Sequence, residues 1–423
     1  MTLAEKILAR ASGREEVSPG ETVLATVDLA ASPANARDVC RRFLAAGGET
    51  VWDADRIAIV LGHMARRGGG ASRKALREFV HEQGLRHFYD VGRGGVCHQV
   101  MAEGGYVLPG MLVVGTSPHT TIQGALGALA LEIGSERMAT VWKDGRLEME
   151  VPSTIRIEIS GTLRAWLSAK DLVLSLAKEL GDMRGCRSIE LDGPTVAGMP
   201  IASRLVLMGL ARSAGAVAAF APVDDALLDH LTRASGTPMA FSPRWAPDAD
   251  ASYEKVIQFD VHAELSEPQV RCHGKTGGVV ALSELVGRRV DMAVVGSCSN
   301  GRLEDLAVAA MVLAGRRVHA GTRLLVIPAS QQVYLDALRH GCLQELAAAG
   351  AAILPPGCGE ATSIRHGNLA AGETCISTTS CSYDARENSA RQRVYEASPA
   401  VVAAAAAAGR VVHPEDVVEE AVA

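Results

Sequence analysis

Short apolar runs alternate with longer helical patterns along the whole chain. Five apolar runs have the length and composition of strands that are covered on both faces: residues 57–61, 111–115, 155–159, 292–296 and 323–327. Six stretches have a helical pattern: residues 73–82, 169–180, 203–214, 303–314, 331–340 and 343–349. Strands that alternate with helices in this way predict an α/β architecture.

Length and composition extend this pattern to several domains. The chain has 423 residues, which at roughly 150 residues per domain gives about three domains. Hydrophobic residues make up 48% and charged residues 21%, so the chain has enough apolar material for a sizeable core. Two polar stretches, 142–152 and 242–254, lack apolar periodicity and are predicted boundaries.

Charge and hydropathy exclude two classes of partner. The 42 Lys and Arg residues against 48 Asp and Glu give a net charge of -6, and aromatic residues are only 4%, which argues against nucleic-acid binding. The longest apolar run, residues 401–408, is far shorter than the roughly 20 residues that span a bilayer. Residues 1–10 carry charges where a signal peptide needs an apolar segment. We therefore predict a cytoplasmic protein without membrane association.

The nine cysteines are the first candidates for chemistry. They are an odd number spread over a long chain, at positions 40, 97, 186, 272, 298, 342, 358, 375 and 381, which does not suit a disulfide framework. Cys298 follows the predicted strand 292–296, precedes an acidic helix start and is placed where α/β folds bind ligands. The helix dipole there favours the thiolate. Cys358 follows a strand-like run in the same way. Either residue is alternatively a small buried apolar side chain.

Three histidines occupy similar positions in the first 120 residues. His63 and His119 each follow a predicted strand, and His98 lies in a polar loop. Any one of them is open to a purely structural interpretation, but together they indicate one shared site. The glycine-rich segments at 67–70 and 92–95 lack the residues of a nucleotide-binding loop.

These residues belong to longer segments that resemble a known family. The chain is similar to the large subunits of 3-isopropylmalate dehydratase and homoaconitase, members of the aconitase superfamily. The most specific segment is Gly296-Ser-Cys-Ser-Asn-Gly-Arg302. Further matching segments are residues 23–28, 98–99, 109–116, 124–128, 151–156, 169–174, 303–305, 356–359 and 397–400.

The resemblance implies a fold, a reaction and a partner. The fold is three α/β/α domains, expected at 1–152, 153–271 and 272–423, without the swivelling lid domain. In the family a separate small subunit closes over the site and supplies the serine that removes the proton. The reaction is removal and re-addition of water on a hydroxy-di- or tricarboxylate such as an isopropylmalate- or homocitrate-like acid. A four-iron, four-sulfur cluster acts as the Lewis acid.

The site residues implied by the resemblance form three groups. The expected catalytic residues are His63, His98, His119 and Glu190, the expected substrate-binding residues are Asn300, Arg302 and Arg386, and the expected cluster ligands are Cys298 and Cys358. The pair matching His119 and Glu190 is intact. The aspartates that accompany the family's other two histidines are absent, which makes those histidines poorer proton donors at neutral pH.

Two further departures affect the metal and the substrate. The family's third cysteine ligand corresponds to Ala361, which has no sulfur. One of the family's arginines corresponds to Cys381, and we interpret this cysteine as a candidate replacement ligand. The arginine missing at Cys381 also predicts one lost carboxylate contact. Because these changes fall on the site and spare the scaffold, a repurposed site is the favoured interpretation.

Three hypotheses follow from this pattern. The first is a hydro-lyase or isomerase with an altered iron–sulfur centre, or a single metal ion in its place, and a non-standard substrate. The second is a non-catalytic subunit that kept the fold. The third is a metal-free acid–base isomerase that uses His119 and Glu190.

Overall fold

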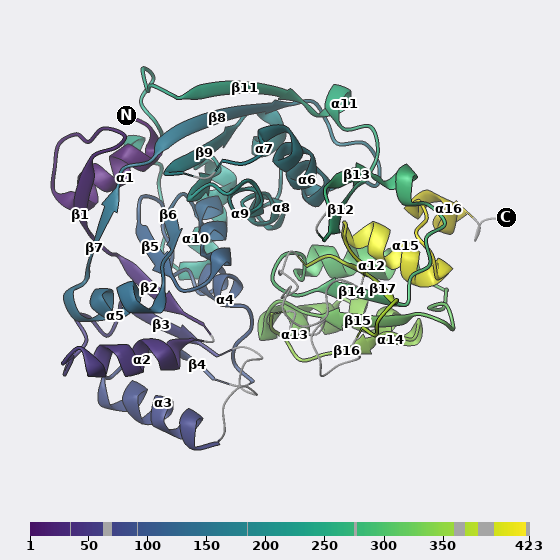
Figure 1. Cartoon of the computed structure of the whole chain (residues 1–423), viewed down its shortest axis with the longest axis horizontal. Helices are drawn as coiled ribbons and strands as arrows, with labels where there is room; N and C mark the ends of the chain where they lie inside the picture. Colours follow the sequence, from purple (N-terminus) through teal and green to yellow (C-terminus); the bar gives the residue numbers. More distant parts are fainter. Residues whose placement is uncertain are drawn as a thin grey trace. The chain divides into compact units, whose positions relative to one another are not determined.

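The computed structural model describes residues 1–33, 35–61, 70–90, 92–183, 185–274, 277–358, 369–379 and 393–419. It divides into two compact units, one formed by Met1–Gly161 with Leu180–Asp260 and the other by Thr162–Glu179 with Val261–Ala423 (Figure 1). The architecture is mixed α/β with largely parallel sheets, as predicted. Within the described ranges, no helix is both long and apolar enough to span a membrane.

A five-stranded parallel sheet forms the first part of the first unit. Its strands, in spatial order, are β4 (His87–Tyr89), β3 (Ile57–Val60), β2 (Leu29–Ser32), β5 (Leu112–Gly115) and β6 (Leu129–Glu132). Alternate residues of these strands enter two different cores, because neighbouring side chains of a strand point to opposite faces. This accounts for the uninterrupted apolar runs that predicted β3 and β5.

Helices cover both faces of this sheet. One core contains residues of α2 (Ala36–Ala45), α3 (Gly70–Glu82) and α5 (Ser135–Asp144), and the other contains residues of α4 (Cys97–Glu103) and α10 (Asp225–Ser235). In the first core Trp142 stacks on Phe79, with ring centroids 5.9 Å apart. Residues 142–152, the predicted boundary, include the end of α5 and the strand β7 (Arg146–Glu150), which pairs with β1 (Thr22–Thr26).

A second, four-stranded parallel sheet belongs to the same unit. Its order is β10 (Ala218–Phe220), β9 (Arg187–Asp192), β8 (Ser153–Ser160) and β11 (Lys255–Asp260). The remaining elements of the unit are α1 (Leu3–Ser12), α7 (Pro194–Ala197), α8 (Ile201–Leu207), α9 (Gly209–Ala214) and η3 (Pro243–Trp245). The predicted helix 203–214 is thus two helices that meet at Gly209, a residue type that weakens helices.

The two sheets of the first unit meet through a long 3₁₀ segment, η2 (Pro118–Leu126), which contacts β6 and β10. Gly124 lies so close to β10 that a Cβ atom there would be 1.7 Å from the carbonyl oxygen of Ala219. The backbone N–H of Ala221 donates to the carbonyl of Gly124 at 3.2 Å. Only a residue without a side chain allows this approach.

We expect Gly124→Ala to lower the free energy of unfolding by about 1–3 kcal/mol or more, because the new methyl group collides with backbone. Urea unfolding followed by circular dichroism measures this change. Gly209→Ala is the matched control, since a Cβ there meets nothing within 4 Å and the position is helical. That control is expected to leave stability unchanged or slightly higher. Equal losses in both variants would contradict the collision.

The second unit contains a seven-stranded sheet. Its order is β13 (Val279–Ala281), β12 (Gln269–His273), β18 (Arg393–Glu396), β17 (Thr374–Ser377), β14 (Met292–Gly296), β15 (Arg323–Ile327) and β16 (Ala352–Ile353). The five strands from β18 to β16 are parallel, and β12 is antiparallel to both of its neighbours. The strands predicted at 292–296 and 323–327 are confirmed.

The helices of the second unit are α6 (Ala169–Leu180), which lies in it up to Glu179, α11 (Val261–Glu264), η4 (Leu282–Leu285), α12 (Leu303–Leu313), α13 (Gln331–Arg339), α14 (Cys342–Ala348), α15 (Pro399–Ala408) and α16 (Pro414–Glu419). The alanine-rich α15 packs on α12 and β14, and Val401–Ala406 are completely buried. The alanine run is therefore a core helix. The predicted domain boundary after residue 152 falls just before β8, the one after residue 271 falls inside β12, and the division into three domains stays a prediction.

Candidate functional site

Two of the three predicted histidines lie together in the first unit. His98 is on α4 and His119 is on the first turn of η2, directly after β5. Their ring centroids are 5.5 Å apart, and their side chains are 4% and 6% exposed. The start of η2 is held by Ser117, whose hydroxyl accepts the N–H of His119. His63 lies outside the described residues.

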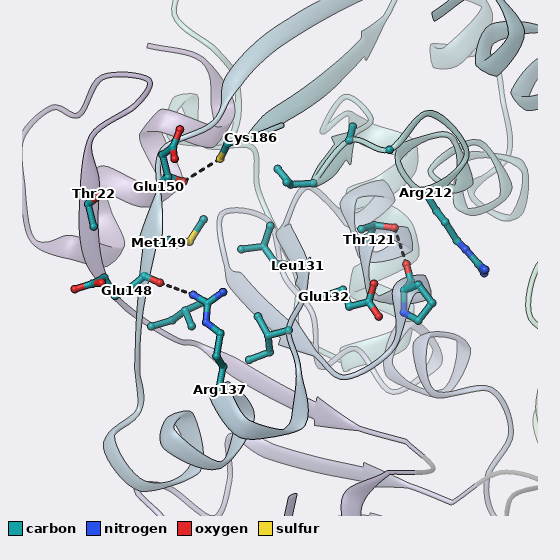
Figure 2. Close-up of a pocket in the computed structure, with 16 residues that line it drawn as sticks. Thr22, Thr121, Leu131, Glu132, Arg137, Glu148, Met149, Glu150, Cys186 and Arg212 are labelled. Carbon is teal, nitrogen blue, oxygen red and sulfur yellow. Dashed lines mark hydrogen bonds between the residues drawn. The ribbon is translucent and has the colours of Figure 1, made fainter. Parts of the chain in front are cut away.

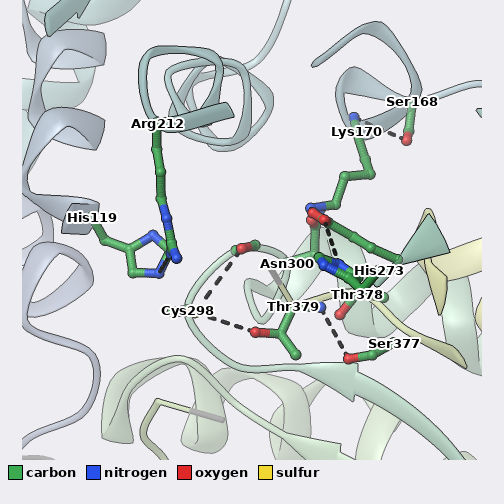
Figure 3. A network of polar contacts seen from close by, with 12 residues as sticks. His119, Ser168, Lys170, Arg212, His273, Cys298, Asn300, Ser377, Thr378 and Thr379 are labelled. Atoms are coloured by element: carbon green, nitrogen blue, oxygen red, sulfur yellow. Dashed lines mark hydrogen bonds and ion pairs between the residues drawn. The ribbon is translucent and has the colours of Figure 1, made fainter. Parts of the chain in front are cut away.

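The ring of His119 contacts a residue that sequence reasoning missed. Arg212, on α9, places Nη1 3.0 Å from Nε2 of His119 (Figure 3). The two residues are 93 positions apart in the chain. A polar arginine inside the predicted helix 203–214 was visible in the sequence, but nothing in its spacing connects it to a histidine so far away.

Glu190, the predicted partner of His119, makes other contacts. On β9 it is 5% exposed; its Oε1 accepts the backbone N–H of Leu3 at 2.6 Å and its Oε2 accepts the hydroxyl of Tyr253 at 2.8 Å. Burial raises the pKa of this carboxyl group, and the bond from Leu3 acts in the opposite direction. Both oxygens are engaged, so these contacts do not support the pairing with His119, which stays a prediction.

A cavity of about 650 Å³ adjoins this part of the unit (Figure 2). Its lining includes Glu132 on β6, Arg137 on α5 and Arg212 on α9. Arg137 is directed toward β7, where it donates to the carbonyl of Glu148. Partial burial raises the pKa of Glu132, and the guanidinium of Arg212 acts in the opposite direction. The cavity wall therefore carries both signs of charge.

In the second unit, Cys298 lies on a sharp turn at the end of β14. Gly296 has a φ of 114°, and a Cβ atom there would be 2.1 Å from the carbonyl oxygen of Ile327. Ser297 has a φ of 73°, a strained value for a residue with a side chain. The turn buries Cys298, whose Sγ is 3.4 Å from Oγ1 of Thr379. Such stored strain concentrates at functional sites.

The two predicted substrate-binding residues of this segment are part of the loop and helix start. Nδ2 of Asn300 donates to Oδ1 of Asp305 at 2.9 Å, and the backbone N–H of Arg302 donates to its Oδ2 at 3.0 Å. Nη1 of Arg302 also donates to the carbonyl of Ser299 at 2.8 Å. Among the described residues, Oδ1 of Asn300 is buried without a hydrogen-bond partner, which leaves one acceptor for a ligand.

Cys358 follows β16 and is half-buried. Because β14, β15 and β16 are parallel, Cys298 and Cys358 both follow the carboxyl ends of strands at one edge of this sheet. No group of three or more His, Cys, Asp or Glu residues in the described ranges is arranged to hold a metal ion. Ala361, Cys381 and Arg386 lie outside those ranges. The described donor set, with two thiols, does not by itself fit a four-iron cluster.

A buried ion pair lies in the same unit. Nζ of Lys170, on α6, is 2.5 Å from Oε1 of Glu396, at the end of β18, and the two side chains are 3% and 2% exposed (Figure 3). Nε2 of His273 is 3.4 Å from Oε2 of Glu396. Burial raises the pKa of Glu396, but the charge of Lys170 and the contact with His273 outweigh it and lower the pKa to about 2.

Comparison with known proteins shows which family the chain matches. A model of the aconitase family (aconitate hydratase) matches residues 64–289 and 278–409. The chain is 41% identical to the 3-isopropylmalate dehydratase large subunit 1 of Methanopyrus kandleri, over 98% of both chains. It is 37% identical to the probable methanogen homoaconitase large subunit of Methanothermobacter thermautotrophicus, over 98% of each.

Among solved structures, aconitase X of Thermococcus kodakaraensis aligns with a TM-score of 0.48 and 12% identity, over 84% of this chain and 83% of that one. The curated relatives are named as dehydratases or a homoaconitase, that is, as hydro-lyases of the aconitase superfamily, in agreement with the enzyme class predicted from the sequence. The family match over most of its length and these near-full-length identities show that the chain belongs to the aconitase family.

Proposed function

We propose that this chain is the large subunit of a hydro-lyase or isomerase that acts on a hydroxy-di- or tricarboxylate, isopropylmalate- or homocitrate-like in its chemical class. The observation that carries the proposal is the strained turn that buries Cys298 at the end of β14, at the position of a cluster ligand in the family. The neighbouring rings of His98 and His119 support it with groups that exchange protons near neutral pH.

The metal centre is the more specific part of the proposal. Cys298 and Cys358 would be two thiolate ligands, and Cys381 would supply the third in place of the sulfur absent at Ala361. Three soft thiolate ligands suit an iron–sulfur cluster. Since the described residues contain only two of the three, we assign no reaction step to the metal and restrict the chain's own chemistry to binding and proton exchange.

Iron uptake tests this centre without requiring any turnover. After anaerobic reconstitution with iron and sulfide, Cys298→Ala and Cys381→Ala are expected to retain at least about tenfold less iron per chain than the unmodified protein. Cys40→Ala is the control. Cys40 lies on α2 in the apolar core, and its replacement is expected to leave the iron content unchanged. Equal and negligible iron in the unmodified protein and Cys298→Ala would refute the cluster.

A separate small subunit completes the proposed enzyme. The relatives from Methanopyrus kandleri and Methanothermobacter thermautotrophicus are named large subunits. By resemblance, the partner closes over the site and carries the base that removes the substrate proton. A reading frame beside this gene that encodes such a protein, and turnover that depends on adding it, would support this assignment.

A metal-free isomerase is the second candidate. It is favoured by the two-thiol donor set of the described residues and by the guanidinium of Arg212 beside His119, whose ring neighbours that of His98. A guanidinium binds carboxylates well, and imidazole rings move protons. Turnover of a carboxylated substrate that survives exhaustive chelation and the Cys298→Ala change would select this candidate over the first.

A further inference from the structure

We propose that Arg212 is a positioning residue that holds His119 as the neutral tautomer with its proton on Nδ1. In this state Nε2 accepts a hydrogen bond from the guanidinium, and the ring presents Nδ1–H as a donor. The role of His119 in a reaction rests on the proposed function above, but its protonation state does not. A histidine paired with a carboxylate is expected to be a positively charged imidazolium, whereas His119 beside Arg212 is neutral.

The contact itself carries the first step. Nη1 of Arg212 and Nε2 of His119 are 3.0 Å apart, a hydrogen-bond distance. A guanidinium only donates and stays protonated in proteins, so Nε2 is the acceptor. An imidazolium carries protons on both nitrogens and would place two donors and two positive charges against each other. The geometry is therefore compatible with neutral His119 alone.

Burial strengthens the effect. The side chain of His119 is 6% exposed, so little water screens it from the neighbouring charge. The backbone of η2 is fixed at this point, because Oγ1 of Thr120 donates to the carbonyl of Ser117 at 2.6 Å. Figure 3 shows the side chain of Arg212 running from α9 to the edge of the ring. Neither partner needs to move to make the contact.

Other charged groups lie on the elements that pack against η2. Burial raises the pKa of Glu132, at the end of β6, and its interactions with Arg212 and with His119 lower it, so this carboxylate acts on the His119 ring in the direction opposite to the guanidinium. On α4, Glu103 accepts a hydrogen bond from Gln99, and the ring of His98 lies beside that of His119 at an interplanar angle of 43°. On α8, Arg204 is paired with Asp224. Of these charged groups, the guanidinium of Arg212 is the one for which the structure gives a hydrogen bond with Nε2 of His119.

The chemical consequence is a change of role. A carboxylate partner stabilises the imidazolium and raises the pKa of a histidine, which makes it a proton donor near neutral pH. A guanidinium destabilises the imidazolium, which makes the ring a weaker base and keeps it as a neutral hydrogen-bond donor. A histidine that contacts a guanidinium in place of a carboxylate is therefore a neutral hydrogen-bond donor and not an acid.

Nuclear magnetic resonance of ¹⁵N-labelled histidine tests the proposal on the metal-free chain. The signals of His119 are assigned from their loss in His119→Gln. We expect the Nδ1–H tautomer and a pKa at least about one unit below the ordinary 6.5. Arg212→Gln is expected to raise that pKa by about one unit, a tenfold change in the protonation equilibrium. Arg212→Lys retains a donating cation and is expected to preserve the tautomer.

Two controls separate this effect from a general disturbance. Arg137→Gln removes another arginine of the same cavity and is expected to leave the His119 signals unchanged. If Arg212→Gln does not fold, the tautomer of the unmodified protein decides the matter alone. A proton on Nε2, or titration near 6.5 that Arg212→Gln does not shift, would overturn the proposal. Because the measurement uses neither metal nor substrate, failed iron uptake would refute only the proposed function.

Discussion

Replacing Lys170 with methionine is expected to lower the free energy of unfolding by about 3–5 kcal/mol, because it leaves the carboxylate of Glu396 charged and buried. Urea unfolding, followed by the fluorescence of tryptophan and by circular dichroism, measures the loss. The size follows from burial: a side chain that is 2% exposed cannot recover its lost partner by hydration.

The double variant Lys170→Met with Glu396→Gln gives the sharper result. It is expected to be more stable than Lys170→Met alone, since no buried charge remains. Arg339→Ala is the control, because its ion pair with Asp336 is 66% and 30% exposed and is expected to contribute less than about 1 kcal/mol. If Lys170→Met and Arg339→Ala cost the same, burial is not the cause.

The same pair predicts a pH dependence. The pKa of Glu396 is lowered to about 2 in the folded state, below its value near 4.3 in the unfolded chain. A lowered pKa contributes stability that is complete above the unfolded value and is lost as the pH falls through the folded value. Unfolding midpoints measured between pH 5 and pH 2 are therefore expected to fall less steeply in the double variant than in the unmodified protein.

Arg204→Leu is expected to cost about 2–3 kcal/mol in the first unit. Arg204 is fully buried on α8 and binds Asp224 through both Nη1 and Nη2, at 2.8 and 2.6 Å. Its Nε and Nη2 also donate to the carbonyls of Met199 and Ala197. Leucine leaves these acceptors without a donor. The residue Met199 is buried, so its unpaired carbonyl costs about 1–3 kcal/mol, whereas the carboxylate of Asp224 is 30% exposed and can bind water. Chemical unfolding measures the total.

The matched control for this change is Arg233→Leu on α10, an exposed arginine that is expected to stay within about 0.5 kcal/mol of the unmodified protein. A second measurement connects stability to the site. Because α8 packs on η2, Arg204→Leu is also expected to broaden the resonances of His119. An unchanged His119 spectrum together with the full loss of stability would show that the two regions are uncoupled.

Sequence periodicity predicted the strands well, because a strand that is buried on both faces is apolar in its own residues. The runs at 57–61 and 292–296 are apolar throughout, since helices cover both faces of their sheets. The same pattern placed Cys298 at the end of β14 correctly. Where composition was polar, periodicity did not reveal the strand: residues 146–150 pair with β1, and Leu147 is the one residue of this strand that is buried.

Sequence periodicity could not predict which charged groups pair with each other. Glu190 and Leu3 are 187 positions apart, and His119 and Arg212 are 93 apart, so both contacts depend on how the sheets and helices assemble. The resemblance predicted Glu190 as the charged partner of His119, and that pairing stays a prediction; the contact with the guanidinium of Arg212, a group of the opposite charge, comes from the structure. Local signals locate candidate residues, whereas only the fold shows which of them meet.

The alanine-rich helix α15 has a consequence for how this chain can change over time. Ala403, Ala404, Ala405 and Ala406 follow one another around the helix, and each is completely buried. A helix enclosed on every side has no face on which a larger residue finds room. The alanine run therefore looks like low-complexity sequence, but the space around each of these residues allows no larger side chain. Glycine is the only smaller replacement, and it weakens the helix.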